Sequence, residues 1–280
     1  NLSKDMNKKR FKADFDFICG QSHLGVEGVW KITSPLPGPT LGVTIHTHGN
    51  EPSGLAVLSH FKNVFPLTKH LLKGTVVFVL NNIKATDNFL NSKTSEEESA
   101  CRFVDINMNR LPDDVMQLSE HDTRYEVCRA KRLKKVWESF DIGFDIHSFG
   151  QNSPPMIMNI GKVSTQLIQG FPIGNIISNI EEIQVNSPAI SFYGNGCIPI
   201  MAIESGSHFA DTSFKRAILC TKKLLQNLDM LGGRVESVIA TYVEYIVMSS
   251  ILFPNVEFEL VDTFENYGKV TKGQVIATDG

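Results

Sequence analysis

The sequence LGVTIHTHGNEPSG occupies residues 41–54 and decides both the predicted fold and the predicted site. Residues 41–45 form an apolar run typical of a buried strand, and a helical pattern begins at Pro52. His48 and Glu51 lie three residues apart on the turn between strand and helix. A neutral imidazole and a carboxylate placed there can bind one face of a divalent cation such as zinc. We therefore expect a metal site where this strand ends, completed by a ligand from another segment.

The segment Phe144-Asp145-Ile146-His147-Ser148 supplies a plausible third ligand. It ends another strand-like run with a histidine, and catalytic sites of open α/β sheets lie across adjacent strand ends. Two histidines and a glutamate leave the fourth position of a tetrahedral zinc ion open to water. Such a site is catalytic rather than structural, and it lowers the pKa of water to about 7. His48, Glu51 and His147 therefore predict one zinc ion per chain and a hydrolytic reaction.

Composition restricts the class of protein. The chain has 280 residues, of which 42% are hydrophobic and 20% charged, so it can form one large domain with or without a small appendage. A formal net charge of -3 argues against a nucleic-acid partner. No apolar run approaches the ~18 residues of a membrane span, and the N-terminus lacks a signal-peptide pattern. Five scattered cysteines, an odd number, favour reduced thiols and a cytoplasmic location.

Strands and helices are expected to alternate along most of the chain. Strand-like segments occur at residues 25–32, 41–46, 74–80, 140–147, 155–160 and 197–204. Helices are expected at 52–65, at 125–140, and from an N-cap at Asp211 to about Leu231. This alternation predicts the α/β fold class, with a three-layer α/β/α core and a mixed sheet.

The predicted hydrolase domain spans residues 1–233. The remaining residues, 234–280, are rich in β-forming segments and turns, and we expect a small all-β domain that is incomplete at its C-terminal end. Residues 94–99, an acidic stretch, are expected to form a solvated loop without chemistry of its own.

Two further segments carry chemistry. Glu204 ends an apolar run and precedes a flexible Ser-Gly-Ser loop, so it could take a proton from water and deliver it to a leaving nitrogen; the alternative is a strand-end glutamate in a surface ion pair. The segment 102–110 contains two arginines and two asparagines. Arg102 beside a metal could neutralise a developing oxyanion, whereas without the metal residues this segment would be an ordinary polar loop.

Taken together, the motifs resemble those of the succinylglutamate desuccinylase/aspartoacylase family, relatives of the zinc carboxypeptidases. The motifs in chain order are His48-Gly49-Asn50-Glu51, Arg102, Asn109-Arg110, Asp145-Ile146-His147 and Glu204-Ser205-Gly206. The resemblance implies a carboxypeptidase-like α/β/α core, a β-rich C-terminal domain, and zinc-dependent cleavage of the amide bond of an N-acyl amino acid. It implies three metal ligands, His48, Glu51 and His147.

The resemblance also implies roles for the other motif residues. Glu204 would be the general base and acid, and Arg102 would polarise the scissile carbonyl. Asn109 and Arg110 would anchor a substrate carboxylate. Asp145, two residues before the ligand His147, would have a supporting role near the metal.

The sequence departs from the family pattern at two places. The aspartoacylases have another substrate-binding arginine in the stretch before the catalytic glutamate, and residues 191–197 contain none. The family often has Asp-x-Asn-Arg where this chain has Asn107-Met108-Asn109-Arg110. Both departures favour a substrate other than acetylaspartate or succinylglutamate.

Several alternatives stay open at this point. His46 could neighbour the metal or be a satisfied core group, and His208 could line the mouth of the site or lie in a surface loop. A carboxypeptidase-like zinc peptidase would use the same ligands, and a non-catalytic metal-dependent binding protein would keep the scaffold without turnover. The sequence also leaves open a homo-oligomer and another divalent metal.

Overall fold

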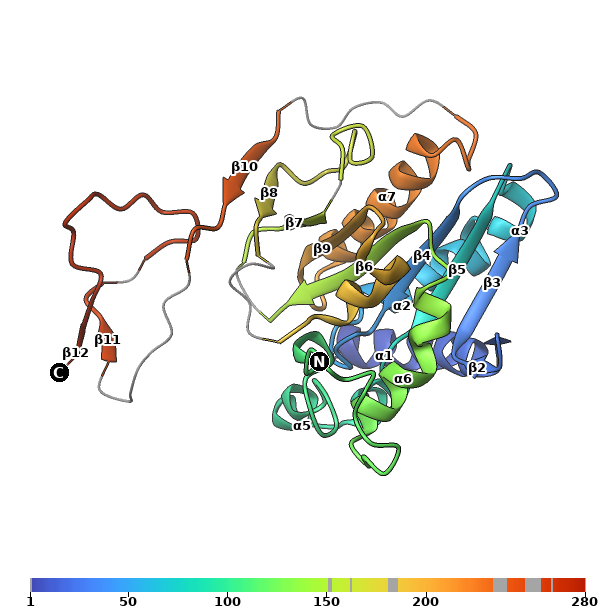
Figure 1. Cartoon of the computed structure of the whole chain (residues 1–280), viewed down its shortest axis with the longest axis horizontal. Coiled ribbons are helices and arrows are strands. Elements are labelled where there is room, and N and C mark those ends of the chain that lie inside the picture. Colours follow the sequence, from blue (N-terminus) through green and yellow to red (C-terminus); the bar gives the residue numbers. More distant parts are fainter. Residues whose placement is uncertain are drawn as a thin grey trace.

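The computed structural model describes residues 2–150, 153–161, 163–180, 186–233, 241–249, 258–262 and 264–279. The chain folds around an eight-stranded mixed sheet with the order β10-β8-β7-β9-β6-β4-β5-β3 (Figure 1). Its strands are β3 (Val29–Thr33), β4 (Thr40–Ile45), β5 (Thr75–Leu80), β6 (Ile142–Phe149), β7 (Met156–Gly161), β8 (Asn175–Ser178), β9 (Ile200–Ser207) and β10 (Val243–Ile246). Strands β5, β4, β6 and β9 form a parallel centre, and β3 and β7 join it in antiparallel pairing with β5 and β9.

Helices cover both faces of this sheet. In chain order they are α1 (Leu2–Cys19), α2 (Ser53–Ser59) with the π-helical turn η1 (His60–Val64), α3 (Leu67–His70), α4 (Ile83–Asn91), α5 (Ser95–Ala100), the 3-10 turn η2 (Met108–Arg110), α6 (Tyr125–Trp137), the 3-10 segment η3 (Ala189–Gly196) and α7 (Asp211–Asn227). α1, α2 and α7 pack together on one face, and α6 and η3 cover the other (Figure 1). The predicted α/β fold with a three-layer core and a mixed sheet is confirmed.

Strand β5 shows why the central strands are continuous apolar runs. Val76, Phe78 and Leu80 pack in the core on the side of α2 and α7, whereas Val77 and Val79 pack in the core on the side of α6. All five side chains are buried. Because the strand is covered on both faces, its sequence does not alternate between apolar and polar residues.

Two glycines let aromatic side chains lie directly on the sheet. A Cβ atom on Gly42 would lie 2.1 Å from the ring of Phe140, and a Cβ atom on Gly143 would lie 2.7 Å from the ring of Tyr193. Any larger residue would push these rings away from the sheet. The close approach allows the buried Tyr193 hydroxyl to donate to Thr44 Oγ1 at 2.7 Å.

Some local predictions were wrong. The N-cap of α7 is Ala210, with Asp211 one residue inside the helix, and the helix ends at Asn227 because the chain turns at Asp229, whose φ is 52°. The acidic stretch predicted as a loop contains α5, which begins with a capping box between Thr94 and Glu97. Helices α1 and α4 were not predicted from the sequence.

The C-terminal residues contribute to two sheets. β10 pairs in parallel with β8 at one edge of the large sheet, and β11 (Phe258–Leu260) pairs with β12 (Ala277–Asp279). The other small sheet is the pair of β1 (Ser22–His23) and β2 (Val26–Glu27). The predicted β segments near residues 235–253 and 256–261 lie partly outside the described residues, and the division of the chain after residue 233 stays a prediction.

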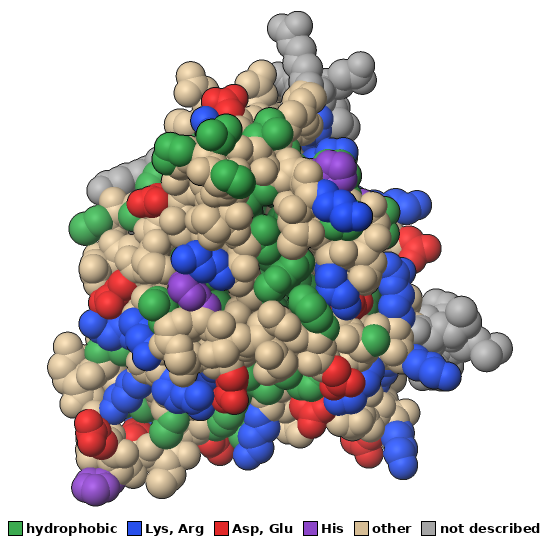
Figure 2. Space-filling model, turned by 90° about the vertical axis from the view of Figure 1, so that its right-hand side faces the viewer, with side chains coloured by type: hydrophobic (Ala, Val, Ile, Leu, Met, Phe, Trp, Pro, Cys, Tyr) green, Lys and Arg blue, Asp and Glu red, His purple; other side chains and the backbone are tan. Residues whose placement is uncertain are grey.

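Acidic, basic and apolar side chains are interspersed over the face of the molecule shown in Figure 2. No helix among the described residues is long and apolar enough to span a bilayer.

Candidate metal and active site

The sheet topology brings the candidate residues to one edge. Strands β4 and β6 are parallel neighbours, and β6 and β9 are also parallel neighbours, so the carboxyl ends of all three meet. His147 on β6 is paired directly with Glu204 on β9. His48 and Glu51 lie on the turn that leaves β4. Residues far apart in the sequence thus become neighbours at the position where open α/β sheets bind ligands.

His48, Glu51 and His147 form one buried cluster. Nδ1 of His48 lies 2.7 Å from Oε1 of Glu51, and Nδ1 of His147 lies 2.8 Å from Oε2 of the same carboxylate. One ligand atom from each of the three side chains lies within 4.8 Å of the others, and each residue is at most 3% exposed. These three residues could hold a metal ion.

The Nε2 atoms of the two histidines, which point away from Glu51, also form hydrogen bonds. Nε2 of His147 lies 2.8 Å from Oδ2 of Asp145, and Nε2 of His48 lies 3.0 Å from Oδ1 of Asn107. Asn107 Oδ1 also accepts the backbone N–H of Asn109 at 2.8 Å, which fixes the orientation of the amide. Nε2 of His48 is therefore the donor in its bond to Asn107, just as His147 donates to a carboxylate.

This hydrogen bonding fits a cation between the three residues. When each neutral imidazole carries its proton on Nε2, its Nδ1 lone pair faces the Glu51 carboxylate. Lone pairs facing a carboxylate repel it unless a proton or a cation lies between them. Metal-binding histidines characteristically donate their other N–H to a carboxylate or carbonyl oxygen, as both do here. The donor set of two nitrogens and a carboxylate suits zinc.

Asp145 links the cluster to a group of buried polar side chains that hydrogen-bond to one another. Its Oδ1 accepts hydrogen bonds from Thr44 Oγ1 at 2.8 Å and Thr47 Oγ1 at 3.0 Å. Thr44 in turn accepts from Tyr193, and Thr47 accepts from the Asn81 amide at 2.8 Å. Asp145 is fully buried, and these donors hold its carboxylate in the position that receives the His147 proton. Asp145 thus contacts His147 on the side opposite Glu51, and its predicted supporting role stays a prediction.

The charges of the cluster are mutually dependent. Burial raises the pKa of Glu51, but His48 and His147 outweigh it and hold that pKa well below its ordinary value. Burial lowers the pKa of His147, yet Asp145 and Glu51 hold it well above its ordinary value. Without a metal ion, the protein thus retains a proton where a cation fits.

Glu204 lies beside this cluster in an unusual environment. Its Oε2 is buried and has no hydrogen-bond partner among the described residues. Burial raises the pKa of Glu204 to about 8, and the negative charge of Glu51 adds to the rise, while His147 and Arg102 oppose it. The alternative of a surface ion pair does not match these observations. A carboxyl group that exchanges a proton near neutral pH is suited to general acid and base chemistry.

Gly49, on the turn that follows β4, joins the motif to the backbone of Arg102. Its N–H donates to the carbonyl oxygen of Arg102 at 3.0 Å, and a Cβ atom on it would lie 2.4 Å from the carbonyl oxygen of Cys101. Only glycine allows this contact between the two segments. The guanidinium of Arg102 then donates to Oε1 of Glu51 at 2.9 Å, with 42% of its side chain still exposed.

Asn109 and Arg110 lie on η2, close to Arg102. Arg110 is exposed and donates to the carbonyl oxygen of Asn109 at 2.6 Å. Partial burial of the guanidinium lowers the pKa of Arg110, and the positive charge of Arg102 adds to the fall. Two neighbouring cations are suited to a carboxylate ligand.

His46 is fully buried, with its Nδ1 lying 3.1 Å from the carbonyl oxygen of Gly49. Burial lowers its pKa to about 4, so the ring is neutral. It is a core histidine that supports the turn after β4.

Residues 37–169 match the model of the succinylglutamate desuccinylase/aspartoacylase catalytic domain. They belong to that family. The resemblance indicated by the motifs is thereby confirmed, and the matched residues include seven of the eight candidate side chains. Glu204 lies outside the match, on β9. No curated protein matches the chain at a significant level of sequence similarity.

Several solved structures have a similar fold. The succinylglutamate desuccinylase of Vibrio parahaemolyticus has a TM-score of 0.65 and 17% identity, over 90% of this chain and 76% of that one. The corresponding values for the Vibrio cholerae enzyme are 0.66, 17%, 90% and 75%. The product-bound ectoine utilization protein EutE of Ruegeria pomeroyi has a TM-score of 0.61 and 15% identity, over 89% and 75%.

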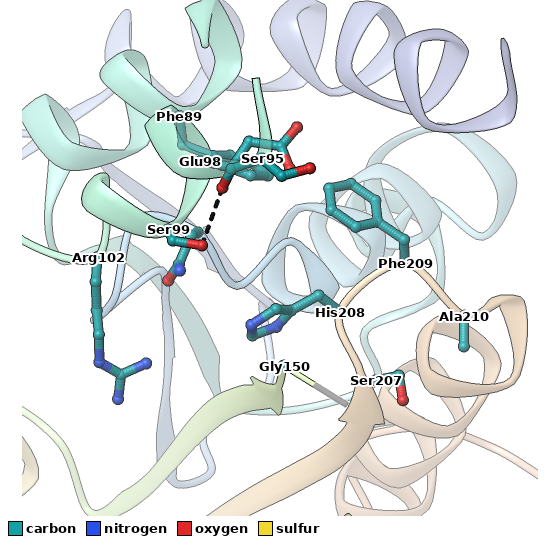
Figure 3. A pocket seen from close by; sticks show the side chains of 11 residues that line it. Phe89, Ser95, Glu98, Ser99, Arg102, Gly150, Ser207, His208, Phe209 and Ala210 are labelled. Carbon is teal, nitrogen blue, oxygen red and sulfur yellow. Dashed lines mark hydrogen bonds between the residues drawn. The ribbon is translucent and has the colours of Figure 1, made fainter. Parts of the chain in front are cut away.

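A cavity of about 700 Å³ opens beside the desuccinylase/aspartoacylase motifs (Figure 3). Arg102 and His208 both line it, and Nδ1 of His208 lies 2.8 Å from Ser148 Oγ. Sequence reasoning missed Glu98, which lies on the cavity wall, and assigned Asn107 no part in holding His48. The capping box of Thr94 could have revealed α5, whereas no local signal reveals the partner of His48.

Proposed function

We propose that the chain is a metal-dependent hydrolase, with one zinc ion per chain, that cleaves the amide bond of a small N-acyl amino acid. The observation that carries the proposal is the pair of Nδ1 atoms that face Glu51 while both Nε2 atoms are used as donors. Zinc held by His48, Glu51 and His147 would supply Lewis acidity toward the carbonyl and a lowered pKa for water.

Glu204 is the residue proposed to move the proton. Its raised pKa allows it to accept a proton from the attacking water near neutral pH and to return it to the leaving nitrogen. The same carboxyl group serves both steps. From its position beside His147 on the neighbouring strand, it therefore has to contact first the water and then the leaving nitrogen.

The two arginines are proposed to act on different parts of the substrate. Arg102 would offset negative charge that develops on the carbonyl oxygen, because its guanidinium is already held beside Glu51. Arg110 with Asn109 would bind the substrate carboxylate. A small substrate that carries a carboxylate next to its amide bond satisfies both requirements.

The family supports this reaction class. The matched domain is named for desuccinylases and aspartoacylases, and two of the similar structures are succinylglutamate desuccinylases. These names favour amide hydrolysis of a small acyl amino acid over cleavage of a longer peptide.

The first test measures metal content and hydrolysis together. The chain purified without chelator is expected to hold about one zinc ion by mass spectrometry. His147→Ala should lose the ion, and His121→Ala, a change at an exposed position, should keep it. The loaded protein is then assayed against a panel of N-acyl amino acids by detecting the free amine. Absence of metal even after zinc is supplied would overturn the proposal.

Glu204→Gln distinguishes the proposal from its rivals. The change should abolish amide hydrolysis and leave zinc binding intact, because Glu204 is not among the proposed ligands. A zinc peptidase would lose activity toward peptides instead of acyl amino acids. A non-catalytic binding protein would bind its ligand equally well with glutamine at this position.

A further inference from the structure

The cavity beside Arg102 has the size of a ligand site. Its volume of about 700 Å³ lies within the range of small-molecule pockets, and it is far larger than an acetyl group requires. Its lining residues come from α4, α5, the turn after β4 and the segment between β9 and α7. Figure 3 shows Ser95, Glu98 and Ser99 on the α5 side, with Phe209 projecting from the opposite side.

The charges along this wall compensate each other. Arg102 is the one arginine or lysine among the described lining residues, and it contacts Glu51. Glu98 is the one acidic residue among them, and its Oε1 lies 2.6 Å from Nζ of Lys8. Both side chains of this ion pair are at most 13% exposed, so the charge of Lys8 is already matched. Besides Arg102, the described lining residues offer a substrate carboxylate no guanidinium or ammonium group, only the His208 imidazole and neutral polar groups.

The cavity has a partly exposed aromatic ring instead, that of Phe209, which is backed by the fully buried ring of Phe89. The rings of Phe89 and Phe209 are stacked at 5.9 Å between centroids, with 29° between their planes. Both residues line the cavity, together with the hydroxyl groups of Ser95, Ser99 and Ser207. A wall of this composition favours an uncharged group with an apolar portion against the ring of Phe209.

The proposed carboxylate anchor contributes no side chain to the described lining of the cavity. Neither Asn109 nor Arg110 is among its lining residues, whereas Arg102, the proposed partner of the scissile carbonyl, is. The half of the substrate on the other side of the amide bond is therefore placed here. We propose that this cavity selects an uncharged acyl group larger than acetyl, such as a medium-length aliphatic or aromatic acyl chain. This inference rests on the proposed function.

The test compares acyl groups on one amino acid. The zinc-loaded full chain is assayed with N-acetyl, N-hexanoyl, N-benzoyl and N-succinyl derivatives of each common amino acid. The expected kcat/KM for the hexanoyl or benzoyl derivative exceeds that for the succinyl derivative by about tenfold or more, because a desolvated carboxylate without a partner is strongly disfavoured. It should also exceed the value for the acetyl derivative.

A charge introduced into the wall should change this preference. Ser99→Arg places a cation in the cavity at an exposed position, and it should raise kcat/KM for the succinyl derivative by about tenfold. Ser99→Gln, of similar length but neutral, should not. If no derivative of any amino acid is hydrolysed, the proposed function fails and this inference fails with it. If the succinyl or acetyl derivative is the best substrate of the wild type, the function stands and the inference is overturned.

Discussion

Oδ1 of Asn107 accepts a hydrogen bond from Nε2 of His48 at 3.0 Å. The equivalent partner of His147 is the carboxylate of Asp145, at 2.8 Å. The two proposed histidine ligands thus have unequal support, one from a neutral amide and one from a charged group. A carboxylate makes its histidine a more basic ligand than an amide does, so His48 is expected to be the weaker of the two.

Removal of the Asn107 side chain should weaken metal binding. Asn107→Ala leaves Nε2 of His48 without its acceptor, and we expect the zinc dissociation constant to rise about 10- to 100-fold. Asn107→Asp supplies a carboxylate and should lower that constant below the wild-type value. Competition with a chromophoric chelator measures both. Asn91→Ala, on the exposed end of α4, is the control and should leave the constant unchanged. Equal affinity of Asn107→Ala and wild type would contradict the assignment.

Glu204 should make the metal-free protein less stable as pH rises. Its folded pKa of about 8 lies above the value near 4.3 expected in the unfolded chain, so the folded state binds the proton more tightly. Stability is therefore lost between pH 4 and 8, with each pKa unit corresponding to about 1.4 kcal/mol. Glu204→Gln should unfold at higher denaturant concentration than wild type at about pH 9, and at the same concentration near pH 4.

The control for this pH dependence is Glu120→Gln, because Glu120 is exposed. It should follow the wild-type unfolding curve at both ends of the range. Identical stabilities of Glu204→Gln and wild type at high pH would show that the carboxyl group is not held in the protonated form by its surroundings.

Asp145 should control the protonation of His147 in the metal-free protein. Asp145→Asn removes one of the two charges that oppose the effect of burial, so the pKa of His147 should fall. The stability contributed by a raised histidine pKa is complete below the unfolded value of about 6.5 and is lost as pH rises through the folded value. The variant should lose part of that contribution. Titration of the ring protons by NMR measures the pKa, with Asp141→Asn, an exposed position, as the control.

The central sheet and the metal cluster were predictable because both depend on local patterns. A continuous apolar run such as residues 75–80 specifies a strand buried on both faces, and a ligand just after such a run must lie at a strand end. Helix α5 had a local signal in its capping box, but the pairing of Glu98 with Lys8, which is distant in the sequence, had none. The role of Asn107 depends in the same way on a tertiary contact. Residues whose function comes from such distant partners carry no local signal.

Gly49 provides the last prediction, because it joins the metal motif to the segment that carries Arg102. A Cβ atom there would lie 2.4 Å from both the carbonyl carbon of Ala85 and the carbonyl oxygen of Cys101, and neither backbone group can rotate away. Gly49→Ala should therefore lower the free energy of unfolding by about 1–3 kcal/mol or more, and it should weaken zinc binding by displacing the motif. Gly150→Ala is the matched control, since its Cβ would meet no described atom within 4 Å. Urea unfolding measures the stability of both variants, and chelator competition measures their zinc affinity. If Gly49→Ala matches Gly150→Ala in both, the two segments can separate without loss of stability, and the close contact does not hold the site together.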